Sequence, residues 1–337
     1  MDSGNNISVI VINYNGKHYL EECFSSLEKQ TYKNFDAYLL DNASKDGSPD
    51  YVAHKFPWVK ILRFDKNYGF AKAYNKAIDI IKSKYVVLLN NDTVLDPKWL
   101  EELVKFIDSD EKIFAVGSKI LFYDKPNVIQ NAGSKATRIG AGIELCFGEK
   151  DRSSIQEKFI GLCGAAMLLK REIFKKIGGL DEDYFICFED LDLCWRAWLN
   201  GYKTLLVPTS IVYHKHGGTM KKTKIYSQRY RYFSHRNAFY NIIKNFEIKN
   251  LFLGLILYFG YTLACLLISF ALKQKETFYS ILNGTIDALK GIKKMMAKRK
   301  IIQATRVVSD KYLFNQELIS GINESIKEFL QMKYFKH

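Results

Sequence analysis

The sequence predicts an α/β domain built on a mostly parallel sheet with helices on both faces, followed by a basic, apolar helical region. Two observations carry this prediction. The first ninety-odd residues alternate continuous apolar runs with helical patterns, which is typical of buried parallel strands covered by helices. Further along, an uncharged apolar run at residues 251–272 lies inside a strongly basic stretch. We therefore divide the 337-residue chain into a domain of residues 1–240 and a helical region of residues 241–337.

Four apolar runs predict the strands of the first part of the chain. They are ISVIVI at 7–12, DAYLL at 36–40, VKILRF at 59–64 and YVVLL at 85–89. Helical patterns fill the gaps, around residues 19–30, 50–56 and 70–81. Ligands of such sheets bind beyond the carboxyl ends of the strands, so the residues that follow each run are the first candidates for a site.

Polar residues follow every one of these runs. Asn, Asp and Gly are ordinary turn residues, but four such turns at the same relative place favour a binding site. No GxGxxG follows the first run and no GxxxxGK[ST] occurs, which argues against a dinucleotide fingerprint and a P-loop. If a nucleotide binds here, a divalent cation held by Asp92 would supply the positive charge that its diphosphate needs. The four turns are Asn13-Tyr14-Asn15-Gly16, Asp41-Asn42-Ala43-Ser44, Asp65-Lys66-Asn67-Tyr68-Gly69 and Asn90-Asn91-Asp92-Thr93.

A second candidate lies in YFICFEDLDLCWRAWLNGY, residues 184–202. A helical pattern begins at Glu189 and Asp190, and Gly201 ends it as a left-handed cap. At a helix N-terminus the free N–H groups and the dipole favour ionised carboxylates, so this pair could accept a proton. The alternative is that acidic residues simply favour a helix start. Asp192 and Arg196, four residues apart, predict an intrahelical ion pair.

The net charge of +14 is confined to the C-terminal part of the chain. Residues 1–214 hold 28 Lys and Arg against 29 Asp and Glu, whereas residues 215–250 hold nine against one and residues 273–337 hold 13 against six. A basic block fits either nucleic acid or an anionic membrane surface. The uncharged run of 22 residues inside it favours the membrane over nucleic acid.

The apolar run leaves several arrangements open. Its 22 residues are long enough to cross ~30 Å of hydrocarbon. A single crossing would export the basic tail against the positive-inside tendency, so a hairpin or an in-plane helix is the alternative. A dimer interface is a third possibility, which would make the protein an oligomer. Six cysteines without a CxxC pair and an N-terminus without a basic leader pattern predict a reducing, cytosolic setting.

Seven motifs in order resemble family 2 glycosyltransferases with a GT-A fold, in particular the rhamnosyltransferase-like members. The resemblance covers about residues 7–240. Each motif is weak alone, and the ordered set is specific. The motifs are VIVINYNG, DNASKDGS, NYGFAKAYNKAI, LLNNDT, GLCGAAMLLKR, GGLDEDYFICFEDLDLCWRAWLNGY and VYHKHGGT.

The resemblance implies a nucleotide-sugar site with a metal. Asn90-Asn91-Asp92 corresponds to the family's DxD element, whose last Asp binds Mg2+ or Mn2+, and Asn90 replaces the first carboxylate. His214 matches a histidine that completes the metal site in many relatives, with His216 as a second candidate. The residues implied to bind the nucleotide-sugar are Asn13, Asn15, Asp41, Asn67, Gly69, Asn75, Asn90 and Asn91.

The resemblance also implies an inverting transfer in which Asp190 is the general base and Glu189 supports the acceptor or orients the base. Arg196 lacks the QxxRW context of processive synthases, so we expect a single sugar to be added. The expected donor is dTDP-rhamnose or a UDP-sugar, and the acceptor a polyprenyl-linked or surface glycan at the cytoplasmic face of the membrane. The alternative, motivated by Asn90, is a catalytically weakened, membrane-attached sugar-nucleotide-binding protein. RNA binding by the basic block is a third hypothesis.

Overall fold

The computed structural model describes residues 6–152, 155, 158–159, 161–215 and 224–321. The chain forms two compact units that are interleaved along the sequence. Unit 1 comprises Met1–Ser134, Glu144–Phe185 and Tyr202–Lys221, and unit 2 comprises Lys135–Ile143, Ile186–Gly201 and Lys222–His337. The predicted boundary between residues 240 and 241 falls inside one continuous helix, α7. Each unit is described by itself below.

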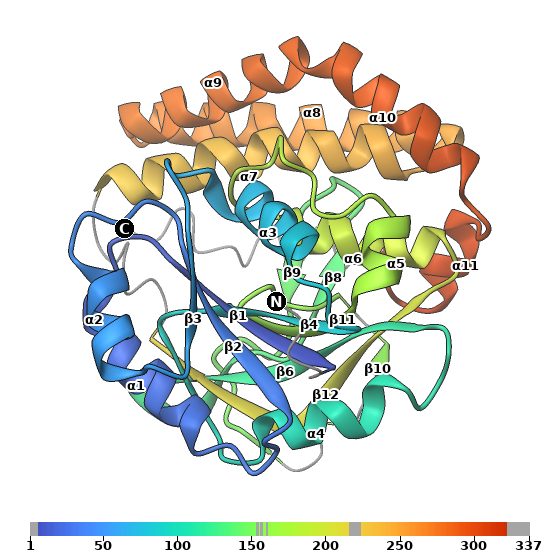
Figure 1. Ribbon diagram of the computed structural model, residues 1–337. Coiled ribbons are helices and arrows are strands. Elements are labelled where there is room, and N and C mark those ends of the chain that lie inside the picture. Colours follow the sequence, from blue (N-terminus) through green and yellow to red (C-terminus); the bar gives the residue numbers. More distant parts are fainter. Residues whose placement is uncertain (1–5, 153–154, 156–157, 160, 216–223, 322–337) are drawn as a thin grey trace. The chain divides into compact units, whose positions relative to one another are not determined.

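Unit 1 is built on a mixed sheet of ten strands in the order β10-β12-β6-β11-β4-β1-β2-β3, with β5 paired to β12 and β7 to β6 (Figure 1). The four predicted strands are β1 to β4, and they pair in parallel as expected. Strand β11 runs antiparallel between β4 and β6, which makes the sheet mixed. The strands are β1 Ile7–Asn13, β2 Phe35–Asp41, β3 Lys60–Arg63, β4 Tyr85–Asn90, β5 Thr93–Leu95, β6 Ile113–Phe122, β7 Lys125–Asn131, β10 Lys158–Phe159, β11 Ala166–Lys170 and β12 Lys203–His214.

Helices cover both faces of this sheet. Alternate residues of a strand point to opposite faces, so Ile7, Val9 and Val11 of β1 share one core with the apolar sides of α1, α2 and α4. On α3, the Tyr74 hydroxyl donates to the backbone carbonyl oxygen of Leu89 at 3.0 Å. The helices of unit 1 are α1 Lys17–Glu28, α2 Ser48–Lys55, α3 Gly69–Ile80, α4 Trp99–Ile107 and α5 Arg171–Lys176.

In its described residues, unit 2 is helical apart from a small pairing of β8 with β9. Figure 1 shows α9 leading into α10 next to α8, and α7 packs against all three helices. Arg299 of α10 donates to the carbonyl oxygens of Ile243 and Phe246 at the end of α7, which places a cation at the negative end of that helix. The elements are β8 Ser134–Ala136, β9 Gly142–Glu144, α6 Glu189–Leu199, α7 Lys224–Asn245, α8 Ile248–Ala271, α9 Lys275–Lys290, α10 Ile292–Ala304 and α11 Asp310–Asn315.

Helix α8 contains the predicted apolar run. Among the described residues it is the one helix long and apolar enough to cross a membrane. An 18-residue stretch of it has a mean hydropathy of 2.3, and 28% of that stretch is buried against the rest of the protein. Core helices of soluble proteins can be equally long and apolar, so length and hydropathy do not by themselves make α8 a membrane span.

Candidate active site

The ends of β1 and β2 place two predicted residues next to each other. Asn13 and Asp41 are paired in register, and both side chains are buried. The Asn13 amide donates to Ser44 Oγ at 3.0 Å, and its Oδ1 accepts from Asn91 Nδ2 at 2.6 Å. A Cβ on Gly16 would lie 2.2 Å from Asn91 Nδ2 and 2.7 Å from Asn13 Oδ1, so a side chain here would displace this pair. Asn13 and Asn91, predicted separately, thus form one hydrogen-bonded floor.

Asp41 carries an oxygen without a partner. Its Oδ2 accepts from the Ser44 backbone N–H at 3.2 Å, whereas Oδ1 is buried and makes no hydrogen bond within the described parts of the chain. A buried acceptor without a hydrogen bond costs free energy, so this oxygen is suited to accept from an N–H or hydroxyl group of a ligand. Asn15 joins the same turn, because its backbone N–H donates to Ser44 Oγ at 2.9 Å.

The turn before α3 is held by Asn42, which belongs to the second polar turn but is not among the residues predicted to bind the nucleotide-sugar. Its Nδ2 donates to Asn67 Oδ1 at 3.0 Å and to the Gly69 carbonyl at 3.1 Å. Gly69 has a φ of 75° and packs so closely on the Phe185 ring that a Cβ would lie 2.7 Å from it. Asn75 bonds the backbone of Leu180 through both amide atoms, at 2.8 and 3.0 Å, so in this structure it ties α3 to the turn at Leu180.

The predicted metal residues lie together. Strand β12 pairs with β5 so that His214 faces Thr93, and His214 Nε2 lies 3.0 Å from Asp92 Oδ1. Two ligands on one edge of an octahedron with Mg2+–O bonds of ~2.1 Å lie ~3 Å apart, so the pair fits two adjacent positions of such a site. The side-chain amide of Gln130 orients the ring, because the Nε2 and Oε1 atoms of Gln130 lie 2.9 Å and 3.1 Å from His214 Nδ1.

The protein offers few ligands beyond this pair. Within the ranges that the structure describes, no group of three or more His, Cys, Asp or Glu side chains is arranged to hold a metal ion. A magnesium-type cation usually keeps only one or two protein carboxylates and takes substrate phosphates and waters as further ligands. The donor set of Asp92 and His214 fits that pattern. The backbone oxygen of Asn90 accepts from the Thr93 hydroxyl at 2.7 Å. His216, the second metal candidate, lies outside the described residues.

The acidic turn of unit 2 has an unusual backbone. Cys187 and Phe188 have φ values of 71° and 66°, although neither is glycine. Such left-handed conformations cost of order 1–3 kcal/mol each and persist where surrounding contacts impose them. Asn237 of α7 supplies those contacts, because its Nδ2 donates to the carbonyl oxygens of Ile186 at 2.8 Å and Cys187 at 2.7 Å. The segment that leads into Glu189 and Asp190 is therefore held by one buried amide.

Glu189 and Asp190 begin α6 as predicted, but their environments differ. Glu189 is 8% exposed, and its Oε2 makes no hydrogen bond in the part of the chain described here. Burial, and then the charge of Asp190, raise the pKa of Glu189 to about 8. The expectation that the helix N-terminus keeps both carboxylates ionised is therefore wrong for Glu189. Asp190 is half-buried, and its Oδ1 accepts from the Leu191 N–H at 2.7 Å.

The predicted ion pair on α6 is confirmed and is part of a larger buried network. Arg196 Nε donates to Asp192 Oδ2 at 2.8 Å. On the other oxygen, Asp192 Oδ1 accepts from Lys244 Nζ at 2.7 Å and from Asn245 Nδ2 at 3.2 Å, both from the end of α7. The side chains of Asp192 and Lys244 have no exposed surface, so one carboxylate lies between two buried cations.

The comparison with known families decides the class. The model of the family described as glycosyl transferase family 2 matches residues 8–178, which is half of the chain. The chain belongs to glycosyl transferase family 2. The predicted resemblance is confirmed. The N-acetylglucosaminyl-diphospho-decaprenol L-rhamnosyltransferase of Mycobacterium tuberculosis is 26% identical over 232 residues, which cover 62% of this chain and 75% of that protein.

Solved structures agree on the fold of this family 2 chain. The mannosyltransferase PcManGT of Pyrobaculum calidifontis, in complex with GDP-Man and Mn2+, has a TM-score of 0.54 at 19% identity and covers 89% of this chain and 86% of its own. A structure of GalNAc-T7 with UDP, GalNAc and Mn2+ has a TM-score of 0.56 at 18% identity, over 71% of this chain and 47% of that one. The predicted GT-A fold is confirmed.

The clamp on the acidic turn of this family 2 chain leads to a prediction. If Glu189 and Asp190 act on the acceptor as the sequence predicts, Asn237→Ala should lower kcat by about tenfold or more, because a small displacement of catalytic groups weakens catalysis even when the fold persists. Asn241→Ala is the matched control, since that buried amide of α7 donates to the Gly140 carbonyl oxygen at 2.8 Å. Both variants should lose about 1–3 kcal/mol in urea unfolding. Equal kcat values in the two variants would show that the clamp is only structural.

Proposed function

We propose that the protein is an inverting, metal-dependent glycosyltransferase that transfers one sugar from dTDP-rhamnose or a UDP-sugar to a lipid-linked or surface-glycan acceptor. The observation that carries the proposal is the pair of Asp92 Oδ1 and His214 Nε2, 3.0 Å apart at the carboxyl end of the sheet in a family 2 chain. The printed name of the mycobacterial relative, a rhamnosyltransferase acting on a diphospho-decaprenol, supports the donor and acceptor classes.

The donor is held by unit 1 in this proposal. Asp92 and His214 would hold a divalent cation, Mg2+ or Mn2+, which supplies positive charge opposite the diphosphate of the donor. The Asn13–Asn91 floor and the unpartnered Asp41 Oδ1 bind the base and ribose through hydrogen bonds. Asn67 and Gly69 shape the adjoining wall. Gln130 holds the imidazole of His214 with Nε2 toward Asp92.

The acceptor is activated by the acidic turn of unit 2. Asp190 takes the proton of the acceptor hydroxyl as that oxygen bonds to the anomeric carbon from the side opposite the diphosphate. The bond from the anomeric carbon to the diphosphate oxygen breaks in the same step, so the configuration inverts. Glu189, protonated at neutral pH because burial raises its pKa, donates a hydrogen bond to the acceptor. Arg196 is engaged with Asp192, and no QxxRW element surrounds it, which supports addition of one sugar.

We place the enzyme at the cytoplasmic face of the membrane, where a polyprenyl-linked acceptor would be presented. The apolar helix α8 and the basic tail support this location. A sugar-nucleotide-binding protein with weakened catalysis is the second candidate, and the observation that favours it is Asn90 in place of a carboxylate. Metal-dependent hydrolysis of a nucleotide-sugar by the purified protein would reject this second candidate.

Removing the Asp92 carboxylate should abolish metal-dependent donor binding. A true donor with Mn2+ raises the unfolding free energy by about 2.7 kcal/mol at a hundredfold excess over Kd, which a thermal-shift screen of UDP-, dTDP- and GDP-sugars detects. Asp92→Ala should lose the part of this shift that requires Mn2+. Asp124→Ala, in an exposed turn between β6 and β7, is the control and should keep it. Equal Mn2+-dependent shifts in both variants would reject Asp92 as a metal ligand.

A further inference from the structure

Helix α8 has one buried face along its whole length. Leu251, Gly254, Tyr258, Thr262, Cys265 and Ser269 recur at intervals of three and four residues and are all buried. Helices α7 and α9 cover this face. The contact is close, because a Cβ on Gly254 would lie 3.0 Å from the Arg138 carbonyl oxygen. It is also polar, since the Tyr258 hydroxyl donates to the His235 carbonyl oxygen at 3.2 Å.

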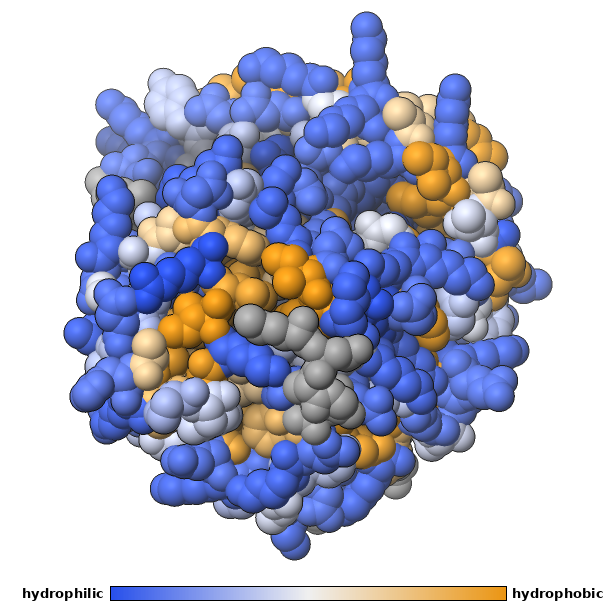
Figure 2. Space-filling view, in the orientation of Figure 1, coloured by the Kyte–Doolittle hydropathy of each residue, from blue (hydrophilic) through white to orange (hydrophobic). Residues whose placement is uncertain are grey.

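The opposite face of α8 is an exposed apolar stripe. Its members repeat at the same helical spacing and are between 42% and 74% exposed. Most of the face seen in Figure 2 is hydrophilic, whereas this stripe continues for about five helical turns. A continuous exposed apolar surface of this length marks an interaction site. The stripe consists of Phe252, Ile256, Phe259, Leu263, Leu267 and Phe270.

The packing of α8 argues against a simple crossing of the membrane. If α8 crossed the membrane, its buried face would either take α7 and α9 into the hydrocarbon or separate from these two helices. The neighbours are polar, since Tyr232 of α7 donates to Asp287 of α9 at 2.6 Å and Lys290 lies 2.9 Å from the same carboxylate. Charged groups are costly inside a bilayer. A helix with one packed face and one apolar face fits the plane of a membrane surface instead.

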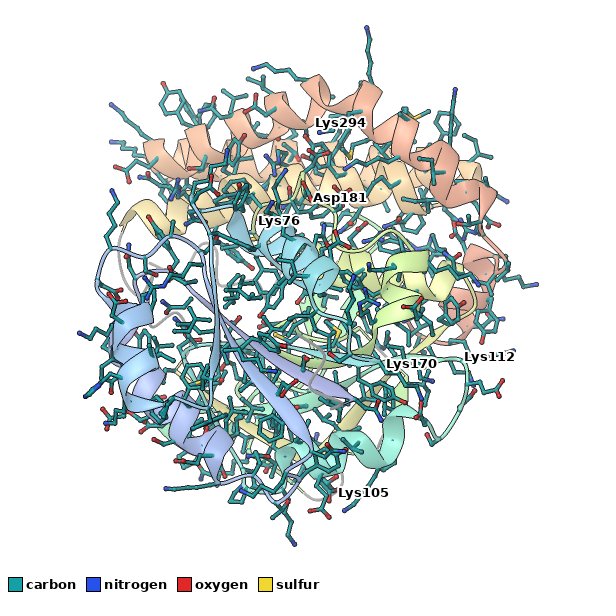
Figure 3. The ribbon with its side chains drawn as sticks, in the orientation of Figure 1. Lys76, Lys105, Lys112, Lys170, Asp181 and Lys294 are labelled. Atoms are coloured by element: carbon teal, nitrogen blue, oxygen red, sulfur yellow. The ribbon has the colours of Figure 1, made fainter. Side chains whose placement is uncertain are left out.

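Positive charge accompanies the stripe. Residues 273–306 hold nine Lys and Arg against two acidic residues. Lys273 and Lys275, both exposed, follow directly after the end of the stripe, and Lys249 precedes its start. Figure 3 labels Lys294 on α10, the exposed basic helix of the same unit. Lysines near an anionic membrane surface each strengthen binding to it.

We propose that α8 lies in the plane of an anionic membrane, with its apolar stripe among the acyl chains just below the headgroups and the flanking lysines on lipid phosphates. The proposal rests on the proposed function only for the presence of a membrane-linked acceptor. It commits to a phospholipid surface because the cations around the stripe complement lipid phosphates, whereas a second copy of this chain would bring the same positive charge.

Vesicle binding of the full chain tests the proposal. Wild type should sediment with phosphatidylcholine vesicles that contain phosphatidylglycerol, at least tenfold better than with phosphatidylcholine alone, and alkaline carbonate should release it. The triple variant Ile256→Glu, Leu263→Glu, Leu267→Glu should lose at least tenfold in binding to the mixed vesicles. Ile80→Glu is the control, because Ile80 is an equally exposed apolar residue at the end of α3 and should leave binding unchanged.

Three results would overturn the proposal. Wild type that stays in the vesicles after carbonate would indicate a transmembrane span. A triple variant that binds as wild type does would exclude the stripe. If the wild type does not bind vesicles but forms a dimer, and the triple variant is a monomer, the apolar stripe binds a second copy of the chain. Donor binding, measured as the Mn2+-dependent thermal shift, distinguishes failure of this proposal from failure of the proposed function. The triple variant should retain donor binding.

Discussion

Replacing Asp190 with asparagine should lower turnover by about 10²–10⁴ and leave donor binding largely intact. The amide cannot accept the proton of the acceptor hydroxyl, yet its oxygen can still accept the hydrogen bond that Asp190 Oδ1 receives from the Leu191 N–H. The start of α6 should therefore persist. Turnover is followed by release of the nucleotide diphosphate, and donor affinity by the Mn2+-dependent thermal shift.

Glu189→Gln is the matched comparison for this experiment. Because burial and the neighbouring Asp190 raise the pKa of Glu189, the neutral amide resembles the protonated acid that predominates below about pH 8. Turnover at neutral pH should fall much less in Glu189→Gln than in Asp190→Asn. The opposite order, or near-normal turnover in Asp190→Asn, would show that Asp190 is not the base.

Local sequence patterns were enough to locate the elements that carry the polar turns. The four apolar runs became β1 to β4 with ends within two residues. Strands β1, β2 and β4 are largely buried on both faces, and such a strand reads as a continuous apolar segment. Strand β3 lies at the end of the sheet and is only partly buried. The helix after Glu189 began where the acidic pair predicted, and Gly201 adopts the left-handed φ of 77°. The Asp192–Arg196 pair followed from spacing alone.

Contacts between distant segments could not be predicted in this way. Gln130 and His214 are 84 residues apart and meet because β7 and β12 both pair with β6. Nothing in the neighbourhood of Gln130 marks it as a partner of a histidine. Asn237 and Lys244 were hidden for a related reason, since several faces of α7 are buried and its sequence therefore shows no single apolar stripe. Glu189 was misjudged because the pattern reports the helix terminus and not the burial.

The buried charges between α6 and α7 should respond unequally to substitution. Asp192→Ala should lower the free energy of unfolding by about 3–5 kcal/mol, because it leaves the buried cations Lys244 and Arg196 without their shared carboxylate. Lys244→Met should cost less, since the remaining Asp192–Arg196 pair is neutral and methionine keeps most of the apolar volume. Urea unfolding of the two variants measures the difference.

The double variant Asp192→Ala, Lys244→Met separates charge from packing. If uncompensated charge dominates the cost of losing the carboxylate, removing Lys244 as well should recover part of the stability, with a coupling of about 0.5–3 kcal/mol. In the double variant Arg196 Nε has still lost Asp192 as its hydrogen-bond acceptor. The recovery of stability should therefore be incomplete. Equal costs for the two single variants and strict additivity in the double variant would mean that the network contributes through shape alone. If the double variant is more stable than the sum of the two single costs predicts, Asp192 is the residue that allows Arg196 and Lys244 to be buried.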